Sequence, residues 1–178
     1  MKSFSSWVKE NNPGNYVSVD VEGLPLNLVA SLPGTVNSKP HITLMYSPES
    51  SVPLDHINYV LGRKSLLGAV VPVTGVDIFD SLPDDTNGRS EHVGCIVLKV
   101  NSPQINDLHN HLVRLGCKHT YNPFNAHATL IYNCPIDQCR IAAKEIQSKI
   151  ARDGMFLTCK GFNNNFIDKN WVDKLNSP

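Results

Sequence analysis

The sequence HITLMY occupies residues 41–46 and HATLIY occupies residues 127–132, so the pattern H-x-T-L-x-Y occurs twice in a chain of 178 residues. A random order of the same residues, which include seven histidines, would contain roughly 0.3 H-x-T triplets. Chance is therefore a poor explanation for two copies that also share the leucine and the tyrosine. The repetition indicates two related segments that contribute to one site.

Each copy is typical of a β-strand, in which residues i and i+2 project from the same face. His41 and Thr43 therefore project together while Ile42 points to the core, and His127 and Thr129 also share a face. If the two motif strands lie side by side, two imidazoles and two hydroxyls converge in one cleft.

This set of groups suits the cleavage of a phosphodiester bond. An imidazole with a pKa near 6.5 exists in either protonation state at neutral pH. One histidine can take a proton from a nucleophile, such as a ribose 2′-hydroxyl beside the phosphate, and the other can protonate the leaving oxygen. The threonine hydroxyls can bond the non-bridging oxygens as charge develops there. We predict catalytic roles for His41, Thr43, His127 and Thr129 without a metal or other cofactor, and the residues do not decide which histidine is the base.

The same order of elements precedes each motif, namely a strand and then a helical segment. The first set is predicted at 16–21 and 26–32 before the motif at 41–46, and the second at 93–100 and 103–115 before the motif at 127–132. A further long helix is predicted over 135–152 from its apolar stripe. We expect residues 1–14 to form an N-terminal leader and residues 15–178 a single domain of the α+β class.

The composition argues against several classes of function. Lys plus Arg and Asp plus Glu number 16 each, so the chain has no overall basic field for duplex nucleic acid. No apolar stretch reaches the roughly 18 residues of a membrane span, and the N-terminus lacks the apolar core of a signal peptide. Five cysteines without a C-x-x-C pair are typical of reduced thiols in a cytoplasm. We expect a cytoplasmic protein with no membrane association and no obligate protein partner.

The doubled motif resembles that of the two-histidine phosphoesterases, which include RNA cyclic phosphodiesterases and 2′-5′ oligoadenylate phosphodiesterases. That family is defined by two H-x-[ST]-apolar motifs roughly 80 to 90 residues apart, as in this chain. The resemblance implies a bilobal α+β fold in which two antiparallel sheets with outer helices surround a central cleft. It also implies that the histidine and threonine of each motif are catalytic.

Within that family the chain is most similar to phage anti-CBASS phosphodiesterases, which degrade the cyclic di- and trinucleotides, such as cGAMP, that bacteria use as infection alarms. The similarity rests on residues 15–19, both motifs, residues 97–100 and an Asn-rich stretch that closes with Trp171. It implies cleavage of 3′-5′ bonds in the host bacterial cytoplasm, as a means of immune evasion, with Tyr16 and Trp171 stacking on bases. The family tends to read adenine with an acidic residue before the terminal tryptophan. Asn165 is the best match here, and its amide offers a donor as well as an acceptor.

Two other functions use the same sequence features. A linear 2′-5′ oligoadenylate or an RNA 2′,3′-cyclic phosphate end would be cut by the same four residues, so the motif does not separate these substrates. A non-catalytic sponge that sequesters a nucleotide is an alternative of another class. The intact histidine and threonine of both motifs argue against it, because binding alone does not require two positioned acid–base groups.

Five further residues carry weaker signals. His109 and His111 form H-x-H, but residues i and i+2 of a helix do not share a face, so solvated side chains are expected rather than zinc ligands. His119 is expected in a surface loop near the mouth of the cleft. Tyr46 and Tyr132 would point to the core if the motif strands are regular.

Overall fold

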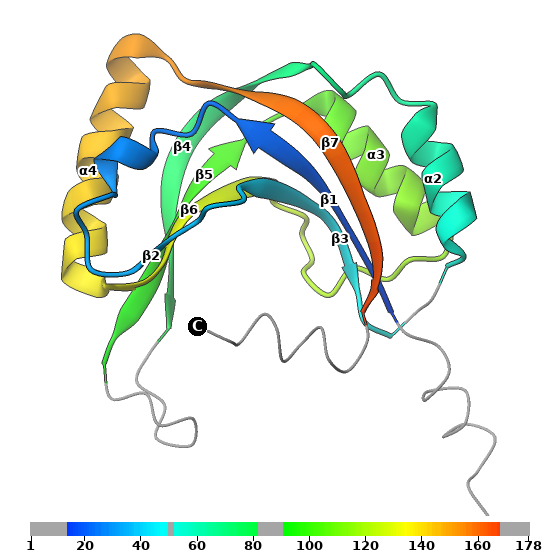
Figure 1. The fold of residues 1–178 in the computed structure, drawn as a ribbon, viewed down its shortest axis with the longest axis horizontal. Coiled ribbons are helices and arrows are strands. Elements are labelled where there is room, and N and C mark those ends of the chain that lie inside the picture. Colours follow the sequence, from blue (N-terminus) through cyan, green and yellow to red (C-terminus); the bar gives the residue numbers. More distant parts are fainter. Residues whose placement is uncertain (1–13, 50–51, 82–90, 168–178) are drawn as a thin grey trace, which may run out of the picture.

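The computed structural model of the chain describes residues 14–49, 52–81 and 91–167. Within these residues a seven-stranded antiparallel sheet is combined with three α-helices and a 3-10 turn (Figure 1), which confirms the predicted α+β class. No helix among them is long and apolar enough to cross a membrane. The elements are β1 (Gly14–Glu22), η1 (Leu26–Leu28), β2 (Thr35–Val36), β3 (His41–Ser47), α2 (Leu54–Gly62), β4 (Val70–Ser81), β5 (Val93–Val100), α3 (Pro103–Arg114), β6 (His127–Pro135), α4 (Ile136–Asp153) and β7 (Phe156–Ile167).

The predicted internal repeat is present in the strand pairing. The first copy is β1, η1 and β3, and the second is β5, α3 and β6. In the first copy Asp20 pairs with the motif histidine His41, and in the second Lys99 pairs with His127 at the equivalent place. The two copies therefore share the order of their elements and the strand register around the motif histidine, while the pairing of β5 with β6 has one further irregularity, between Gly94 and Ile96. Residues 1–13 of the expected leader lie outside the described residues, and β1 begins at Gly14.

The strands form one continuous sheet, whereas two separate sheets were expected. The pair Ile42 and Ala128 joins the motif strands β3 and β6, and β4 pairs first with β7 and then with β5. Because β5 also pairs with β6, the pairings close into a circuit. The two halves share hydrogen bonds at the motif strands, and this contact joins what would otherwise be two sheets.

The sheet bends into an arch, with helices at its two ends (Figure 1). Helix α4 and η1 lie at one end, and α2 and α3 lie at the other. The connection inside each repeat reaches across to the other half, since α3 packs against β3 and β2 pairs with β6. One hydrophobic cluster of buried residues links both halves.

Each motif strand contains a β-bulge at the leucine of H-x-T-L-x-Y. The pairing of β3 with β1 passes over Leu44, and the pairing of β6 with β5 passes over Leu130. A bulge places one extra residue in a strand and shifts the following side chains to the other face. The leucine and the residue after it are consequently both fully buried in each strand.

The prediction that Tyr46 and Tyr132 point to the core is wrong because of these bulges. Beyond the extra residue the alternation is out of phase, so each tyrosine returns to the face that carries the histidine and the threonine. Both side chains are accordingly only partly buried. The bulge therefore adds a tyrosine to the face of each motif strand that carries the histidine and the threonine.

Candidate active site

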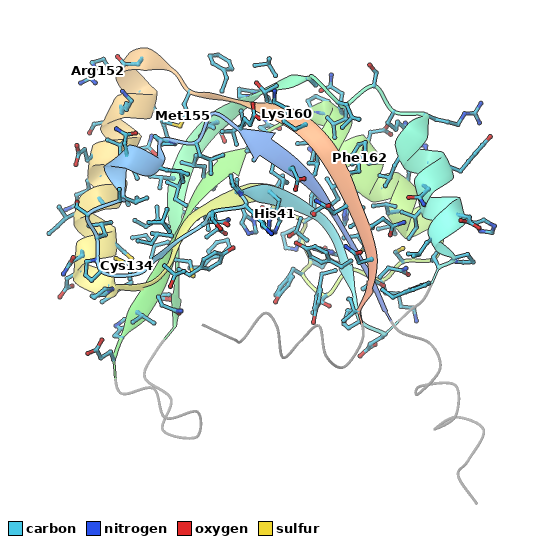
Figure 2. The ribbon with its side chains drawn as sticks, viewed as in Figure 1. His41, Cys134, Arg152, Met155, Lys160 and Phe162 are labelled. Atoms are coloured by element: carbon cyan, nitrogen blue, oxygen red, sulfur yellow. The ribbon has the colours of Figure 1, made fainter. Side chains whose placement is uncertain are left out.

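The pairing of the motif strands brings the four predicted residues together. Ile42 and Ala128 face the core as an antiparallel pair. Their neighbours face the opposite side, so His41 lies beside Thr129 and Thr43 lies beside His127. The two histidines are then diagonal neighbours on one face of the sheet, close enough for long or aromatic side chains to interact. Figure 2 shows His41 at the middle of the concave side of the arch.

Both imidazoles are held by the same kind of backbone hydrogen bond. His41 Nδ1 lies 3.0 Å from the carbonyl oxygen of Lys39, and His127 Nδ1 lies 2.8 Å from that of Asn125. A carbonyl only accepts, so Nδ1 must carry the proton in each ring. The Nε2 atom is then the reactive nitrogen of both histidines, able to accept a proton when neutral and to donate one when charged.

Tyr16 from β1 contacts the reactive atom of His41 directly. Its hydroxyl lies 2.7 Å from His41 Nε2 and 3.0 Å from Thr43 Oγ1. Burial raises the pKa of Tyr16, so the phenol stays protonated and can donate. The base-stacking role expected for this residue must therefore be weighed against a role for its hydroxyl group.

Tyr132 and Asn37 complete the other motif. Asn37 is 8% exposed, and its amide nitrogen donates to the carbonyl oxygen of Thr129 at 3.0 Å and to the Tyr132 hydroxyl at 3.4 Å. Burial raises the pKa of Tyr132, which a hydrogen bond from Thr129 only partly offsets. Each motif threonine thus has a protonated phenol hydrogen-bonded to it.

The two histidines differ in their other neighbours. The ring of Phe79 packs edge-on against His127, with centroids 4.8 Å apart, and Lys99 is its partner across the strand pair. Lys99 also lies 3.6 Å from the carboxylate of Asp77. His41 instead contacts the Tyr16 hydroxyl through its Nε2 atom. The backbone of the two motifs is therefore similar, whereas the side chains around the two histidines differ.

A cavity of about 740 Å³ opens beside His41 and extends over β1 and β7. Most of the residues that line it carry a polar or charged group. The lining residues are Tyr16, Ser18, Asp20, Val21, Glu22, Asn37, Lys39, Pro40, His41, Lys160, Asn163 and Asn165.

Two of the three residues expected to bind substrate line this cavity. Tyr16 and Asn165 face each other across the β1–β7 pair. Trp171 lies outside the described residues. Within the described residues, no group of three or more His, Cys, Asp or Glu side chains is placed to hold a metal ion.

His109 is buried, and the prediction of a solvated side chain is wrong for it. Its ring stacks on Phe124 with centroids 3.9 Å apart, and its Nδ1 donates to the Leu44 carbonyl oxygen at 2.8 Å. His111, on another face of α3, is partly exposed and contacts Asp107. As expected for positions i and i+2 of a helix, the two histidines lie on different faces of α3. The face that carries His109 packs against β3.

His119 lies in the loop after α3, as expected, and its ring is half-buried. The backbone N–H of Tyr46 donates to His119 Nδ1 at 3.1 Å, and the His109 ring lies edge-on with centroids 5.0 Å apart. Burial and the nearby His109 lower the pKa of His119 to about 4. The neutral ring is therefore a structural acceptor for the strand end behind Tyr46.

Sequence reasoning missed several residues of the site. For Tyr132 a signal was present, because a tyrosine repeated at the same place in two motifs suggests a use for its hydroxyl group. Asn37, Asp20 and Asn163 come from segments without any motif, and only their pairing partners bring them to the site.

Comparison with known proteins gives distant structural similarity. No protein family model matches the sequence, and a search of curated proteins finds no similar protein. The chain is similar to a crystal structure described as a phosphoesterase, with 21% identity over 68% of this chain and 74% of the other and a TM-score of 0.43. It is also similar to Escherichia coli LigT in complex with 3′-AMP, with 15% identity over 88% of this chain and 95% of the other and a TM-score of 0.41.

Proposed function

We propose that the chain is a metal-independent phosphodiesterase that cleaves 3′-5′ bonds of cyclic di- and trinucleotides. The observation that carries the proposal is the matched anchoring of His41 and His127, each through Nδ1 to a backbone carbonyl on adjacent strands. This arrangement keeps both Nε2 atoms off the backbone for proton transfer. Such a pair supplies an acid and a base in one cleft. The Tyr16 hydroxyl, which bonds His41 Nε2 in the free protein, would turn to the phosphate when a substrate binds.

The reaction needs two proton transfers and one displacement. One imidazole takes the proton of a ribose 2′-hydroxyl, whose oxygen attacks the adjacent phosphorus. The bond from phosphorus to O5′ breaks, and the other imidazolium gives its Nε2 proton to that oxygen. The products are a 2′,3′-cyclic phosphate and a 5′-hydroxyl. Thr43, Thr129, Tyr16 and Tyr132 are placed to donate hydrogen bonds to the phosphoryl oxygens, where negative charge grows in the transition state.

The surroundings of the site support a small nucleotide over a long RNA. A cavity of about 740 Å³ adjoins His41, while the charges of the chain balance at 16 cationic and 16 anionic residues. Of the two lysines that line the cavity, Lys160 is paired with Glu22 at 2.8 Å. A compact ligand recognised by local groups fits these features better than a polyanion held by a broad field. As the motif resemblance implies, we propose that the substrates are immune signals and that the protein acts in the cytoplasm of an infected bacterium.

The test is a cleavage assay in EDTA. Cyclic di- and trinucleotides, linear 2′-5′ oligoadenylate and a nucleoside 2′,3′-cyclic phosphate are incubated separately with the protein, and the products are separated by chromatography. We expect the cyclic oligonucleotides to be opened. His41→Ala and His127→Ala should each lower the rate by about 10²–10⁴-fold, and His56→Ala, an exposed histidine of α2, serves as the matched control.

The other outcomes are separable. If only the linear oligoadenylate or the cyclic phosphate is cleaved, the protein is a phosphodiesterase, but the proposal that it acts on cyclic signalling nucleotides is wrong. Tight binding of a cyclic oligonucleotide without product would indicate the sponge. Activity that disappears in EDTA, or that survives both histidine variants, would refute the two-histidine mechanism.

A further inference from the structure

The cavity beside His41 contains a carboxylate that the proposed reaction does not use. Asp20 pairs across the strands with His41 and lines the cavity. Asn163 of β7 donates from Nδ2 to Asp20 Oδ1 at 2.6 Å. Among residues 14–49, 52–81 and 91–167, no cationic nitrogen lies within 4.0 Å of this carboxylate. It is a partly exposed negative charge without a cation, next to the place where a phosphate would bind.

A negative charge here is unfavourable for phosphate binding alone, because like charges repel. It becomes favourable if the bound molecule brings N–H donors to it. A carboxylate is an acceptor only, and two oxygens remain available in this cluster. One is Asp20 Oδ2, which lies next to Gly161, a residue without a side chain, where an added Cβ would stand 3.7 Å away. The other is Asn163 Oδ1.

The orientation of the Asn163 amide follows from its partner. A carboxylate cannot donate, so the nitrogen of the amide must face Asp20, and the amide oxygen is left as an acceptor. The cluster therefore presents acceptor oxygens from two neighbouring strands to the cavity. Asp20 and Asn163 are both part of its lining.

Among the four common bases, guanine alone offers two adjacent donors on one edge, its N1–H and its N2 amino group. The corresponding edges of adenine and cytosine present a ring nitrogen lone pair beside the amino group, and that lone pair would face an acceptor. On the basis of the proposed function, we infer that Asp20 and Asn163 form a guanine subsite, which holds the base of the nucleotide whose phosphate lies at His41.

The test compares three rings that differ only in the base. Cyclic di-GMP, cyclic di-AMP and cyclic di-IMP have the same 3′-5′ backbone, and hypoxanthine keeps N1–H but lacks the N2 amino group. We expect kcat/KM for the guanine ring to exceed that for the adenine ring by about tenfold or more, with the hypoxanthine ring between them. Asp20→Asn should lower kcat/KM for the guanine ring about tenfold more than for the adenine ring. Asp137→Asn, an exposed carboxylate of α4, is the matched control.

Equilibrium binding separates the subsite from the reaction. GMP and AMP are titrated into the wild-type protein and into Asp20→Asn, with thermal unfolding as a check that the variant folds. If no ring is opened but GMP binds about tenfold more tightly than AMP and Asp20→Asn loses that preference, the subsite stands and the proposed reaction fails. Equal use of the three rings overturns the subsite. So does an Asp20→Asn variant that slows all three rings by one factor, since the carboxylate would then act on His41 and not on a base.

Discussion

At the scale of single residues, the hydroxyl of Tyr16 is the group whose role the structure changes most. An aromatic ring near the start of the chain suggests base stacking, and phenylalanine would serve that purpose equally well. The structure places the hydroxyl 2.7 Å from His41 Nε2 and 3.0 Å from Thr43 Oγ1. Because burial raises the pKa of Tyr16, the group remains a donor across the neutral pH range.

We predict that Tyr16→Phe lowers kcat by about tenfold or more while changing KM little, because it removes a hydrogen bond to the reactive histidine. The measurement is steady-state cleavage of a cyclic dinucleotide, with Tyr59→Phe as the control, since Tyr59 is 63% exposed on α2. A Tyr16→Phe enzyme with normal kcat would return the residue to a stacking role.

Neighbouring residues also make the two histidines inequivalent, although the two motifs themselves are nearly identical. At equivalent places in the two repeats, Asp20 pairs with His41 and Lys99 pairs with His127. Phe79 packs against His127 alone. His41 therefore borders the cavity, while His127 borders an aromatic ring and the ion pair of Lys99 with Asp77.

At the scale of elements, the two β-bulges decide which side chains line the site. Each bulge is held from the other half of the molecule. His109 and His119 bond the carbonyl of Leu44 and the N–H of Tyr46 in β3, and Asn37 bonds β6. Backbone groups that a bulge removes from the ladder need partners when buried, and these side chains provide them.

We predict that protonation of His119 lowers the free energy of unfolding as the pH falls. Its pKa is about 4 in the folded protein and about 6.5 when unfolded, so the unfolded state binds more protons in between. The stabilisation from the neutral ring is fully present above pH 6.5 and is lost as the pH falls toward 4. For this half-buried ring we expect a loss of about 1 kcal/mol at pH 5, or about 2–4 °C in Tm.

The check is thermal unfolding at pH 7.5 and pH 5. His119→Asn keeps an acceptor near the position of Nδ1 but does not titrate, so its Tm should fall less on acidification than that of the wild type. His56→Asn should behave like the wild type, because His56 is exposed on α2. An identical pH dependence in all three proteins would show that His119 does not control this loss.

At the scale of the whole molecule, the two halves are tied together in three ways. The strand pairings close into a circuit, the connecting segments of the repeats exchange sides, and one hydrophobic cluster spans both halves. We therefore expect each motif strand to keep its position only when both halves are folded.

We predict a single cooperative unfolding transition, even though the chain contains a repeat. Leu44→Ala and Leu130→Ala, which remove fully buried side chains from different halves, should each destabilise the protein by about 2–5 kcal/mol and move the same transition. Urea unfolding followed by circular dichroism gives the midpoint, and hydrogen exchange reports on both halves. If Leu44→Ala exposes β1 and β3 to exchange while β5 and β6 stay protected, the halves are separate units and the prediction fails.

The sequence could not show how side chains from unrelated segments meet. Asn163 lies in an Asn-rich stretch whose membership of β7 follows from pairing with β1, because polar residues give no apolar alternation to recognise. Asn37 follows the two-residue strand β2, too short to leave a periodic signal. His109 lies on the face of α3 that packs against β3, and no pattern in the sequence identifies which strand covers that face.

By itself the sequence determined the α+β class, the internal repeat and the residues of the two motifs, because these are written in short periodicities and in a repeated pattern. Tertiary structure alone decided that the motif strands adjoin in one sheet, that bulges turn Tyr46 and Tyr132 toward the site, and that Tyr16 meets His41. The physical reason is that local alternation specifies which face a side chain takes within its own strand. Register and partner are instead set by hydrogen bonds between segments far apart in the chain, where one extra residue changes every face that follows.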